Sequence, residues 1–330
     1  MTARSEAWYR LRSSRADPPG RARDDSERRR RYQAALQQAE ELWVAAQTAG
    51  PAGRPLPLFY FLAQAGRAIV AACGGDEASC HGLRDPDLTD PFLDSTVSPQ
   101  GNGWFQTVAD ATRSPQLPAG VELGALMASL PELADLDGVG DRWPPALRVW
   151  PGPFPVDVLS SGYQQMSQTY RVPGVVVFRG LPGCLPEVEE ALGPYPDATD
   201  TEPTLERWPT PAGDGYILRW KRADPSADPL PPAYGGDRFR WMRPNLPVGT
   251  RPPSVLMTWW AVLFALSMLA RYHPVEWVTA LDPDTSRVAV VLERTMEVAL
   301  EVVPGLVLEA MQAPAGEGEQ MRIEAAEETK

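Results

Sequence analysis

The chain contains two histidines, His81 and His273, and each precedes a residue that interrupts regular structure, Gly82 or Pro274. Imidazole changes its charge near neutral pH, so two histidines beside the Arg271 guanidinium could transfer protons while the cation stabilises a phosphate. That combination would cleave RNA without a metal ion. Each histidine could equally cap a turn. His81, His273 and Arg271 are therefore the candidate catalytic residues, and the sequence leaves their role open.

A polar stripe on an apolar helix is the second feature that could bind a ligand. Within the helix expected at 55–72, Tyr60, Gln64 and Arg67 are spaced i, i+4 and i+7, so they share one face. The stripe either meets solvent at the edge of the helix or faces the loop at 74–83. In the second case stripe and loop together build a polar pocket.

The stripe, His81 and the corner at 271–273 are expected to lie close together. The helix that carries the stripe ends one short loop before His81, and the apolar run at 254–270 must pack on it to bury both surfaces. A cationic corner on an acidic protein would receive a phosphate or a carboxylate. The alternative is that Asp85 or Glu276 neutralises the arginines. The candidate ligand-binding residues are Tyr60, Gln64, Arg67, His81, Arg271, Tyr272 and His273.

Basic and aromatic side chains alternate along two strand-like segments, 215–221 and 238–242. Such interleaving is typical of surfaces that stack bases and hold the phosphates of single-stranded nucleic acid. A half-buried sheet produces the same alternation, and the net charge of −12 argues against general affinity for nucleic acid or anionic membranes. We therefore favour the structural interpretation. The nucleic-acid candidates are Arg219, Trp220, Lys221, Arg240 and Trp241.

The three cysteines, Cys73, Cys80 and Cys184, could join His81 in a metal site, but the first two are farther apart than the usual pair of metal ligands. We expect neither a metal nor a cofactor. The beginning of the chain lacks the apolar segment of a secretory signal, so we expect a cytoplasmic location.

The elements that must position these residues are organised around 254–270, the longest run without a charged residue. The run is apolar on every face, which is typical of a helix enclosed by other protein. With about five turns it is at the short limit for a membrane span. We expect a buried helix, no second stretch able to cross a membrane, and no membrane association.

Shorter patterns predict the other elements. Helical periodicity predicts helices at 24–48, 55–72, 121–130 and 274–281, and a longer one that opens at 284 and stops at Pro304-Gly305. Two short apolar segments, 95–98 and 104–108, flank Gln100-Gly-Asn-Gly103 and predict a β-hairpin. Strand-like segments follow at 146–150, 175–178, 215–221 and 238–242, where proline and glycine are dense.

These elements predict a protein that is mainly α with a β-rich insertion, an α+β fold in which both chain ends form one helical bundle. The expected parts are a flexible basic arm at 1–23, a helical part with a small hairpin at 24–143, a Pro-rich β insertion at 144–252, a helical part at 253–312 that packs on 24–143, and an acidic disordered tail at 313–330.

Three segments resemble the YaaC-like protein family of bacteria: Pro57-Leu-Phe-Tyr-Phe-Leu-Ala-Gln-Ala-Gly-Arg-Ala68, His81-Gly82-Leu83 and the run from Leu263 to Trp277. The resemblance covers most of the chain, with the helical beginning, the Pro-rich middle and the helical end in the same order. It departs at Gln64-Ala-Gly-Arg67-Ala68, where an Asn-containing segment ending in Lys-Ala is expected. The family has no assigned activity, so the resemblance implies a fold.

The first helices of that family are similar to HEPN domains, in which an aromatic-rich helix leads through a short loop to a histidine. Some HEPN proteins are metal-independent ribonucleases that use an arginine and a histidine a few residues apart. Here Arg67 and His81 are fourteen residues apart, and Arg271 and His273 are two apart. The resemblance therefore implies a HEPN-like helical bundle without the nuclease motif.

Two functions from different classes remain. The first is a soluble, non-catalytic interaction or ligand-binding module, whose partner is an unknown protein or a small anionic ligand. The second is a metal-independent ribonuclease that uses His81 and His273 on RNA. The oligomeric state and the ligand are left open by the sequence.

Overall fold

The computed structural model describes residues 3–89, 91–134, 136, 139, 142–150, 175–179, 194–195, 206–210, 213–219, 240–246 and 251–312. The chain divides into two compact units, one made of Met1–Leu126 with Pro253–Lys330 and the other of Met127–Pro252. Within the described residues the fold is mainly helical with two antiparallel sheets, which agrees with the expected α+β class. The boundaries expected at 144 and 252 stay a prediction, and the tail expected at 313–330 lies outside the described residues.

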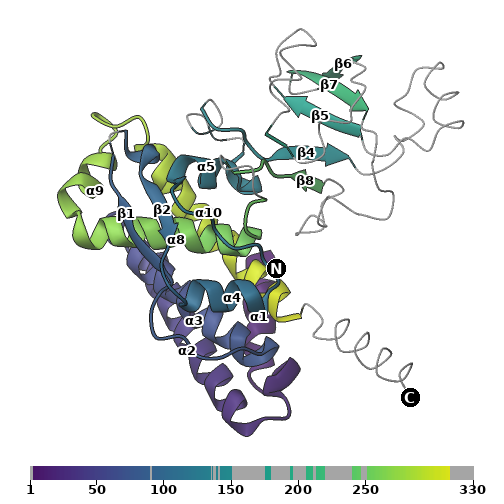
Figure 1. The fold of residues 1–330 in the computed structure, drawn as a ribbon, viewed down its shortest axis with the longest axis vertical. Coiled ribbons are helices and arrows are strands. Elements are labelled where there is room, and N and C mark those ends of the chain that lie inside the picture. Colours follow the sequence, from purple (N-terminus) through teal and green to yellow (C-terminus); the bar gives the residue numbers. More distant parts are fainter. Residues whose placement is uncertain are drawn as a thin grey trace, which may run out of the picture. The chain divides into compact units, whose positions relative to one another are not determined.

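The first unit holds most of the helices (Figure 1). They are α1 (Ala3–Ser14), α2 (Ser26–Thr48), α3 (Pro55–Cys73), α4 (Trp104–Ala111), α8 (Val255–Tyr272), α9 (Pro274–Ala280) and α10 (Ala289–Gln312). Its small sheet has the order β1 (Leu83–Asp87), β2 (Thr96–Pro99) and β3 (Val121–Glu122), with antiparallel pairs. Helix α5 (Leu123–Ala128) follows β3 and shortens the helix that we expected at 121–130.

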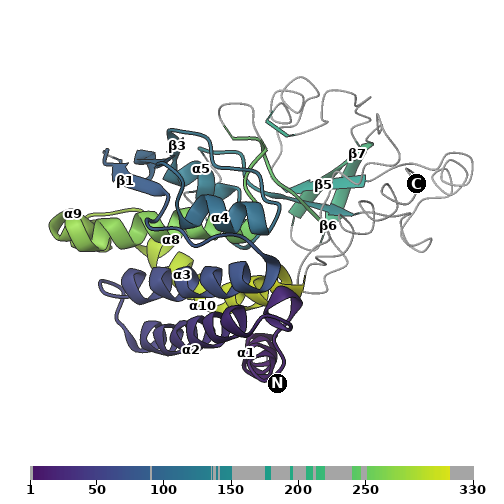
Figure 2. The same ribbon diagram turned by 60° about the horizontal axis from the view of Figure 1, so that its bottom comes forward.

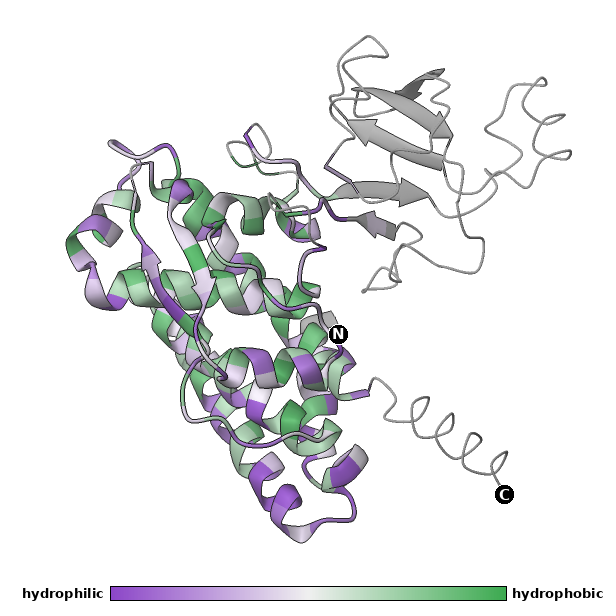
Figure 3. Ribbon diagram, viewed as in Figure 1, coloured by the Kyte–Doolittle hydropathy of each residue, from purple (hydrophilic) through white to green (hydrophobic). Residues whose placement is uncertain are grey.

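Helix α8 forms the core of this unit, as its uncharged sequence predicts. Every residue from Leu256 to Leu269 is buried, and the Ser254 hydroxyl caps the helix by accepting a hydrogen bond from the Met257 N–H. The helix lies between α3 and β1 (Figure 2). Figure 3 shows hydrophobic residues along α8, whereas the connection between α1 and α2 is strongly hydrophilic. Burial on all sides explains why no face of α8 is polar.

Helix α3 is also long and apolar enough to cross a membrane, so our expectation of a single such stretch was wrong. In α3, 61% of the apolar 18-residue stretch is buried, and in α8 the buried share is 78%. Length and composition alone are a weak argument for a span, because the core helix of a soluble protein passes the same test. The burial of both helices within the first unit accounts for their composition without a bilayer.

The first residues do not form the flexible arm expected at 1–23. Residues 3–14 are helical, and Trp8 and Leu11 are 3% and 0% exposed because α1 packs against α10. The Ser14 hydroxyl lies 2.6 Å from the Tyr32 hydroxyl of α2. Trp8 and Leu11 are three residues apart and thus share one helical face, and burial of that face orders an otherwise charge-rich segment.

Of the two strands expected to form a hairpin around Gln100-Gly-Asn-Gly103, only the first is present. Residues 96–99 do form β2, but Trp104 begins the helix α4. The Gln106 side chain accepts a hydrogen bond from the Gly103 N–H at 2.9 Å and donates one to the Gly82 carbonyl at 2.8 Å, which caps the helix start. This cap is local, but the Trp104 N–H also donates to the Cys80 carbonyl at 2.9 Å, and apolar spacing does not reveal such a distant partner.

Helix α10 continues through the proline that was expected to end it. Pro304 lies inside the helix and is buried. A proline has no N–H to donate to the carbonyl four residues earlier, here that of Leu300. The Trp43 indole N–H of α2 donates to that carbonyl at 3.2 Å. A side chain from another helix thus replaces the missing hydrogen bond, and the helix continues to Gln312.

The described strands of the second unit form one antiparallel sheet in the order β6-β7-β5-β4-β8. The strands are β4 (Leu147–Trp150), β5 (Val175–Arg179), β6 (Glu206–Thr210), β7 (Gly213–Arg219) and β8 (Arg240–Met242). Four of them match the strand-like segments of the sequence, and β6 was missed because Pro209 interrupts its pattern. The Arg243 side chain, just after β8, donates to the Ser129 carbonyl at 2.7 Å, and burial lowers the pKa of Arg243 to about 10.

Candidate functional site

The polar stripe expected on α3 is present, and its members differ in exposure. Tyr60 and Gln64 are half-buried, while Arg67 is exposed. The Arg67 guanidinium lies 5.0 Å from the ring centroid of Trp104, the first residue of α4. A cation over an indole face is attracted by the ring's quadrupole, so this contact fixes the direction of the Arg67 side chain. The stripe therefore faces neighbouring elements at both of its ends.

His81 lies at the other end of the stripe, among aromatic rings. The ring centroids of Phe59, Tyr60 and Phe264 lie 5.3, 6.3 and 5.9 Å from that of His81. Its carbonyl accepts a hydrogen bond from the Phe105 N–H at 3.0 Å, so the start of α4 holds its backbone. The imidazole is thus half-buried at the place where the loop after α3 meets α3, α4 and α8.

Arg271, at the end of α8, completes this corner. Its Nη1 donates to the Tyr60 hydroxyl at 3.3 Å, and its guanidinium lies 4.9 Å from the Tyr272 ring centroid. Burial lowers the pKa of His81 below its ordinary value of 6.5, and the positive charges of Arg271 and Arg67 lower it further, while Asp85 opposes them. The imidazole is therefore neutral at pH 7. We call Tyr60, Arg67, His81 and Arg271 the His81 corner.

The arginines of the His81 corner have no carboxylate partner among the described residues. Neither Arg67 nor Arg271 forms an ion pair with Asp85 or Glu276, the acids that were expected to neutralise them in the structural alternative. Arg271 beside the imidazole and Arg67 farther along the stripe make this corner locally cationic on a chain of net charge −12, although the Asp85 charge opposes them.

The structure does not join the second histidine to the first. The His273 backbone N–H donates to the Leu269 carbonyl at 2.9 Å, and the His273 carbonyl accepts from the Trp277 N–H at 2.9 Å, so this residue links α8 to α9. In the described part of the chain, no hydrogen bond, ion pair or ring contact connects the side chains of His273 and His81. Tyr272 is 53% exposed beside Arg271.

Sequence reasoning missed two arginines of α2 that lie near the stripe. Arg28 and Arg31 line a cavity of about 190 Å³ together with Gln64, Arg67 and Trp104. The run Arg28-Arg-Arg-Arg31 was visible, but a run of charges at a helix start usually faces solvent. Only the packing of α2 on α3 brings this run to the stripe.

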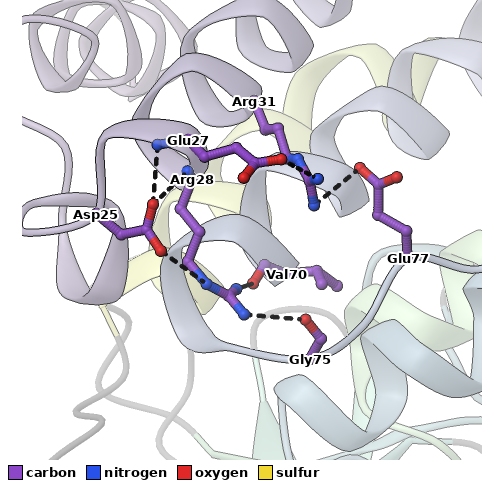
Figure 4. A network of polar contacts seen from close by, with 7 residues as sticks. All are labelled: Asp25, Glu27, Arg28, Arg31, Val70, Gly75 and Glu77. Atoms are coloured by element: carbon purple, nitrogen blue, oxygen red, sulfur yellow. Dashed lines mark hydrogen bonds and ion pairs between the residues drawn. The ribbon is translucent and has the colours of Figure 1, made fainter.

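A polar network holds both arginines (Figure 4). The Arg28 side chain donates to the carbonyls of Val70 and Gly75, at 3.3 Å each. Arg31 forms ion pairs with Glu27 and Glu77, the latter at 3.4 Å. Asp25 accepts the N–H groups of Arg28 and Glu27 at the start of α2, and these hydrogen bonds lower the pKa of the Asp25 carboxyl. The network ties the start of α2 to the loop after α3.

The described nucleic-acid candidates lie on two strands of the second sheet, and their role stays a prediction. Arg219 ends β7, whereas Arg240 and Trp241 lie on β8, and β5 and β4 separate these two strands. Neighbouring strands are about 4.8 Å apart, so β7 and β8 are separated by about 14 Å. Trp220 and Lys221 lie outside the described residues.

The cysteines contribute no metal site within the described residues, where no group of three or more His, Cys, Asp or Glu side chains could hold a metal ion. Cys73 is half-buried, and burial raises the pKa of its thiol. Cys80 is exposed, and Cys184 lies outside the described residues.

Fold and site together define a mainly helical α+β protein with a cationic corner on its helical unit. The model of one family, the YaaC-like Protein family, matches residues 4–146 and 195–311, which is more than half of the chain. The chain therefore belongs to the YaaC-like family, as the three sequence segments indicated. No curated protein and no solved structure matches the chain.

Proposed function

We propose that this YaaC-like protein is a non-catalytic ligand-binding or interaction module whose His81 corner accepts an anionic group. One observation carries the proposal: Arg67 and Arg271 both act on the half-buried His81, and neither has a carboxylate partner among the described residues. A ligand phosphate or carboxylate would supply the missing negative charge. It would also accept hydrogen bonds from the guanidinium of Arg271 and the hydroxyl of Tyr60.

Binding of such an anion is linked to a proton. In the free protein the pKa of His81 is lowered, and a bound anion would raise it by attracting the imidazolium form. The affinity for an anion that keeps its own charge constant therefore increases as the pH falls below 7. Replacement of His81 by Gln is expected to remove this increase and to leave binding at pH 7.5 nearly unchanged.

The test is calorimetric titration of the full chain with inorganic phosphate at low ionic strength. Arg271→Gln should weaken binding by about tenfold, because a hydrogen-bonded charge in a partly dehydrated site contributes on the order of 1.4 kcal/mol. Arg287→Gln is the matched control, since it removes the same charge from an exposed position that makes no contact with the corner. Equal affinities of the two variants would contradict the proposal.

The ribonuclease alternative receives less support. Acid–base cleavage by two histidines needs both side chains at one scissile phosphate. The His81 imidazole packs against Phe59, Tyr60 and Phe264, whereas His273 links α8 to α9 through backbone hydrogen bonds. Incubation with mixed RNA in excess EDTA decides the matter. Cleavage that is lost in both His81→Ala and His273→Ala would favour the enzyme, and intact RNA would favour the binding module.

The proposal also includes a HEPN-like bundle, a bacterial origin and a cytoplasmic location for this protein. The packing of α2 on α3 and the short loop from α3 to His81 support a HEPN-like bundle. A bacterial origin follows from the resemblance to the YaaC-like family. A cytoplasmic location is tested by ultracentrifugation of a lysate, where recovery of most of the chain in a carbonate-resistant pellet would contradict it.

A further inference from the structure

The cavity between α2 and α3 is lined by an unusual excess of cations for so acidic a chain. Its polar lining contains Arg28, Arg31, Gln38, Gln64, Arg67 and Trp104. Glu77 is the one acidic side chain among the described residues that line it. Three guanidinium groups thus face one carboxylate in the lining. Asp25 and Glu27, which pair with Arg28 and Arg31, lie outside it. Amide groups of two glutamines add further hydrogen-bond donors.

Two of the three guanidinium groups are held in place before any ligand arrives. Arg28 is fixed by the carbonyls of Val70 and Gly75, and its side chain is 26% exposed. Arg67 is fixed over the Trp104 ring. An arginine carries five N–H donors. Arg28 uses two of them on these carbonyls and turns its Nε towards Asp25 at 3.9 Å. Donors remain for an oxyanion in the cavity, and little ordering is needed to bind it.

Glu77 occupies the position of an anion in this cavity. Its carboxylate lies 3.4 Å from Arg31 Nη1, although its side chain is 59% exposed. It follows Gly74 and Gly75, whose φ angles of 108° and 119° are ones that glycine adopts readily. An exposed ion pair on a glycine-rich loop is weak and easily exchanged. A ligand with more negative charge would displace Glu77 from Arg31.

The size of the cavity limits the ligand. A water molecule takes up about 30 Å³ of liquid, so a cavity of about 190 Å³ holds roughly six waters or a group of similar size. Phosphate and pyrophosphate fit that limit, and a whole nucleotide does not. A larger cavity of about 760 Å³ shares Gly75 and Glu77 in its lining, so the body of a phosphorylated molecule would have space beside the first cavity.

We propose that the cavity lined by Arg28, Arg31 and Arg67 is a second anion site, specific for a phosphate or pyrophosphate group, and that Glu77 fills it in the free protein. Arg67 belongs to both sites, but Arg31 and Glu77 take no part in the His81 corner, so this site lies beyond the function proposed there. The phosphate group comes either from a free inorganic anion or from a phosphorylated small molecule.

The test is calorimetric titration of the full chain with pyrophosphate. Glu77→Gln is expected to tighten binding by about fivefold, since an exposed ion pair no longer competes. Glu27→Gln is the matched control: Glu27 pairs with the same Arg31 and carries the same charge, but it does not line the cavity. Equal tightening by both variants would show a general charge effect and would overturn the proposal.

A second pair of variants separates this site from the His81 corner. Arg31→Gln should remove pyrophosphate binding to the cavity and keep binding to the His81 corner. Arg271→Gln should remove binding to the corner and keep binding to the cavity. If Arg31→Gln binds like the original protein, the cavity proposal fails while the corner proposal stands. If Arg271→Gln binds like the original protein, the corner proposal fails while the cavity proposal stands. Thermal melting of Arg31→Gln confirms that it is folded, and the Glu77→Gln result stands even if it is not.

The source of the phosphate is decided by comparing pyrophosphate with adenosine diphosphate on the Glu77→Gln variant. Tighter binding of the nucleotide would show that the larger cavity holds the rest of a phosphorylated molecule. Equal or weaker binding would assign the site to the inorganic anion. Absence of binding by either ligand to any variant would overturn the proposal.

Discussion

The two faces of helix α3 differ in how much space they leave. On the face towards α8, Gly66 lies so close to Trp260 that an added Cβ would be 2.4 Å from the Trp260 Cζ3 atom. On the other face, Gln64 and Arg67 border a cavity of about 190 Å³. One helix thus combines a dry, closely packed surface with a polar one that has room for a ligand. The difference teaches that close packing on the apolar face stabilises α3, whereas the polar face leaves room for the proposed ligand.

The largest expected effect is on the packed face. Gly66→Ala should destabilise the protein by about 1–3 kcal/mol, because the new methyl group must displace the Trp260 ring and backbone atoms cannot move far in a dense core. Chemical denaturation measures the change. Gly53→Ala is the control, since no atom lies within 4 Å of a Cβ at that position. Equal stability of the two variants would break the comparison between the faces.

The next effect concerns the hydrogen bond across α2 and α10. Trp43→Phe should cost about 1–2 kcal/mol, because the Leu300 carbonyl loses its donor. In a Pro304→Ala background the cost should be smaller, since the new N–H can serve that carbonyl within the helix. Trp259→Phe is a control, because the indole nitrogen of this buried residue has no hydrogen-bond partner among the described residues. If Trp43→Phe destabilises the protein equally in the Pro304→Ala background, the Trp43 indole does not replace the hydrogen bond that Pro304 lacks.

A smaller effect appears only in acid. The pKa of His81 is lower in the folded than in the unfolded chain, so below about pH 6.5 the unfolded chain binds more protons. His81 therefore contributes to a loss of stability as the pH falls from about 6.5 towards the lowered pKa, and it contributes nothing above that range. His81→Gln should reduce the loss between pH 7 and 5 measured by thermal melting. His273→Gln, which keeps His81, should retain it.

The smallest effect is expected at the surface. Arg12 and Arg15 both pair with Glu40, but their side chains are 53% and 31% exposed. Glu40→Gln should change the free energy of unfolding by about 0.5 kcal/mol at most, because solvent and salt screen such pairs. Denaturation at low and high salt checks this, and the difference should vanish in high salt. A larger loss of stability for Glu40→Gln than for Gly66→Ala would contradict the expectation that the packed face of α3 contributes more than the surface ion pairs.

The elements that the sequence predicted best are those defined by local pattern. The uncharged run at 254–270 and the helical periodicity at 24–48 each indicate one helix without reference to other parts of the chain. The errors at α4 and Pro304 have the same cause. The Trp104 and Phe105 N–H groups at the start of α4 donate to the carbonyls of Cys80 and His81. Trp43 serves a carbonyl 257 positions away, so both elements depend on partners that are remote in sequence.

The candidate site was predictable to a similar extent. The contact between Arg271 and Tyr60 follows from packing α8 on α3, which the sequence already implied. The cavity with Arg28 and Arg31 did not follow, because a charged run at a helix start looks the same whether it faces solvent or a neighbouring loop. His273 was placed near His81 because the run at 254–270 was expected to pack on the helix that leads to His81. That packing is present, but no contact joins the two histidine side chains in the described residues.

The position of α8 late in the chain has a consequence for biosynthesis. Helix α3 ends at Cys73, and the helix that covers its apolar face begins about 180 residues later at Val255. At roughly 5–20 residues per second, a ribosome needs about 10–40 seconds to make that stretch. During this time the nascent chain shows an uncovered apolar helix to chaperones and proteases. Chains arrested before Val255 should be cleaved readily near α3, while released chains resist, and equal resistance would show that α3 finds another cover.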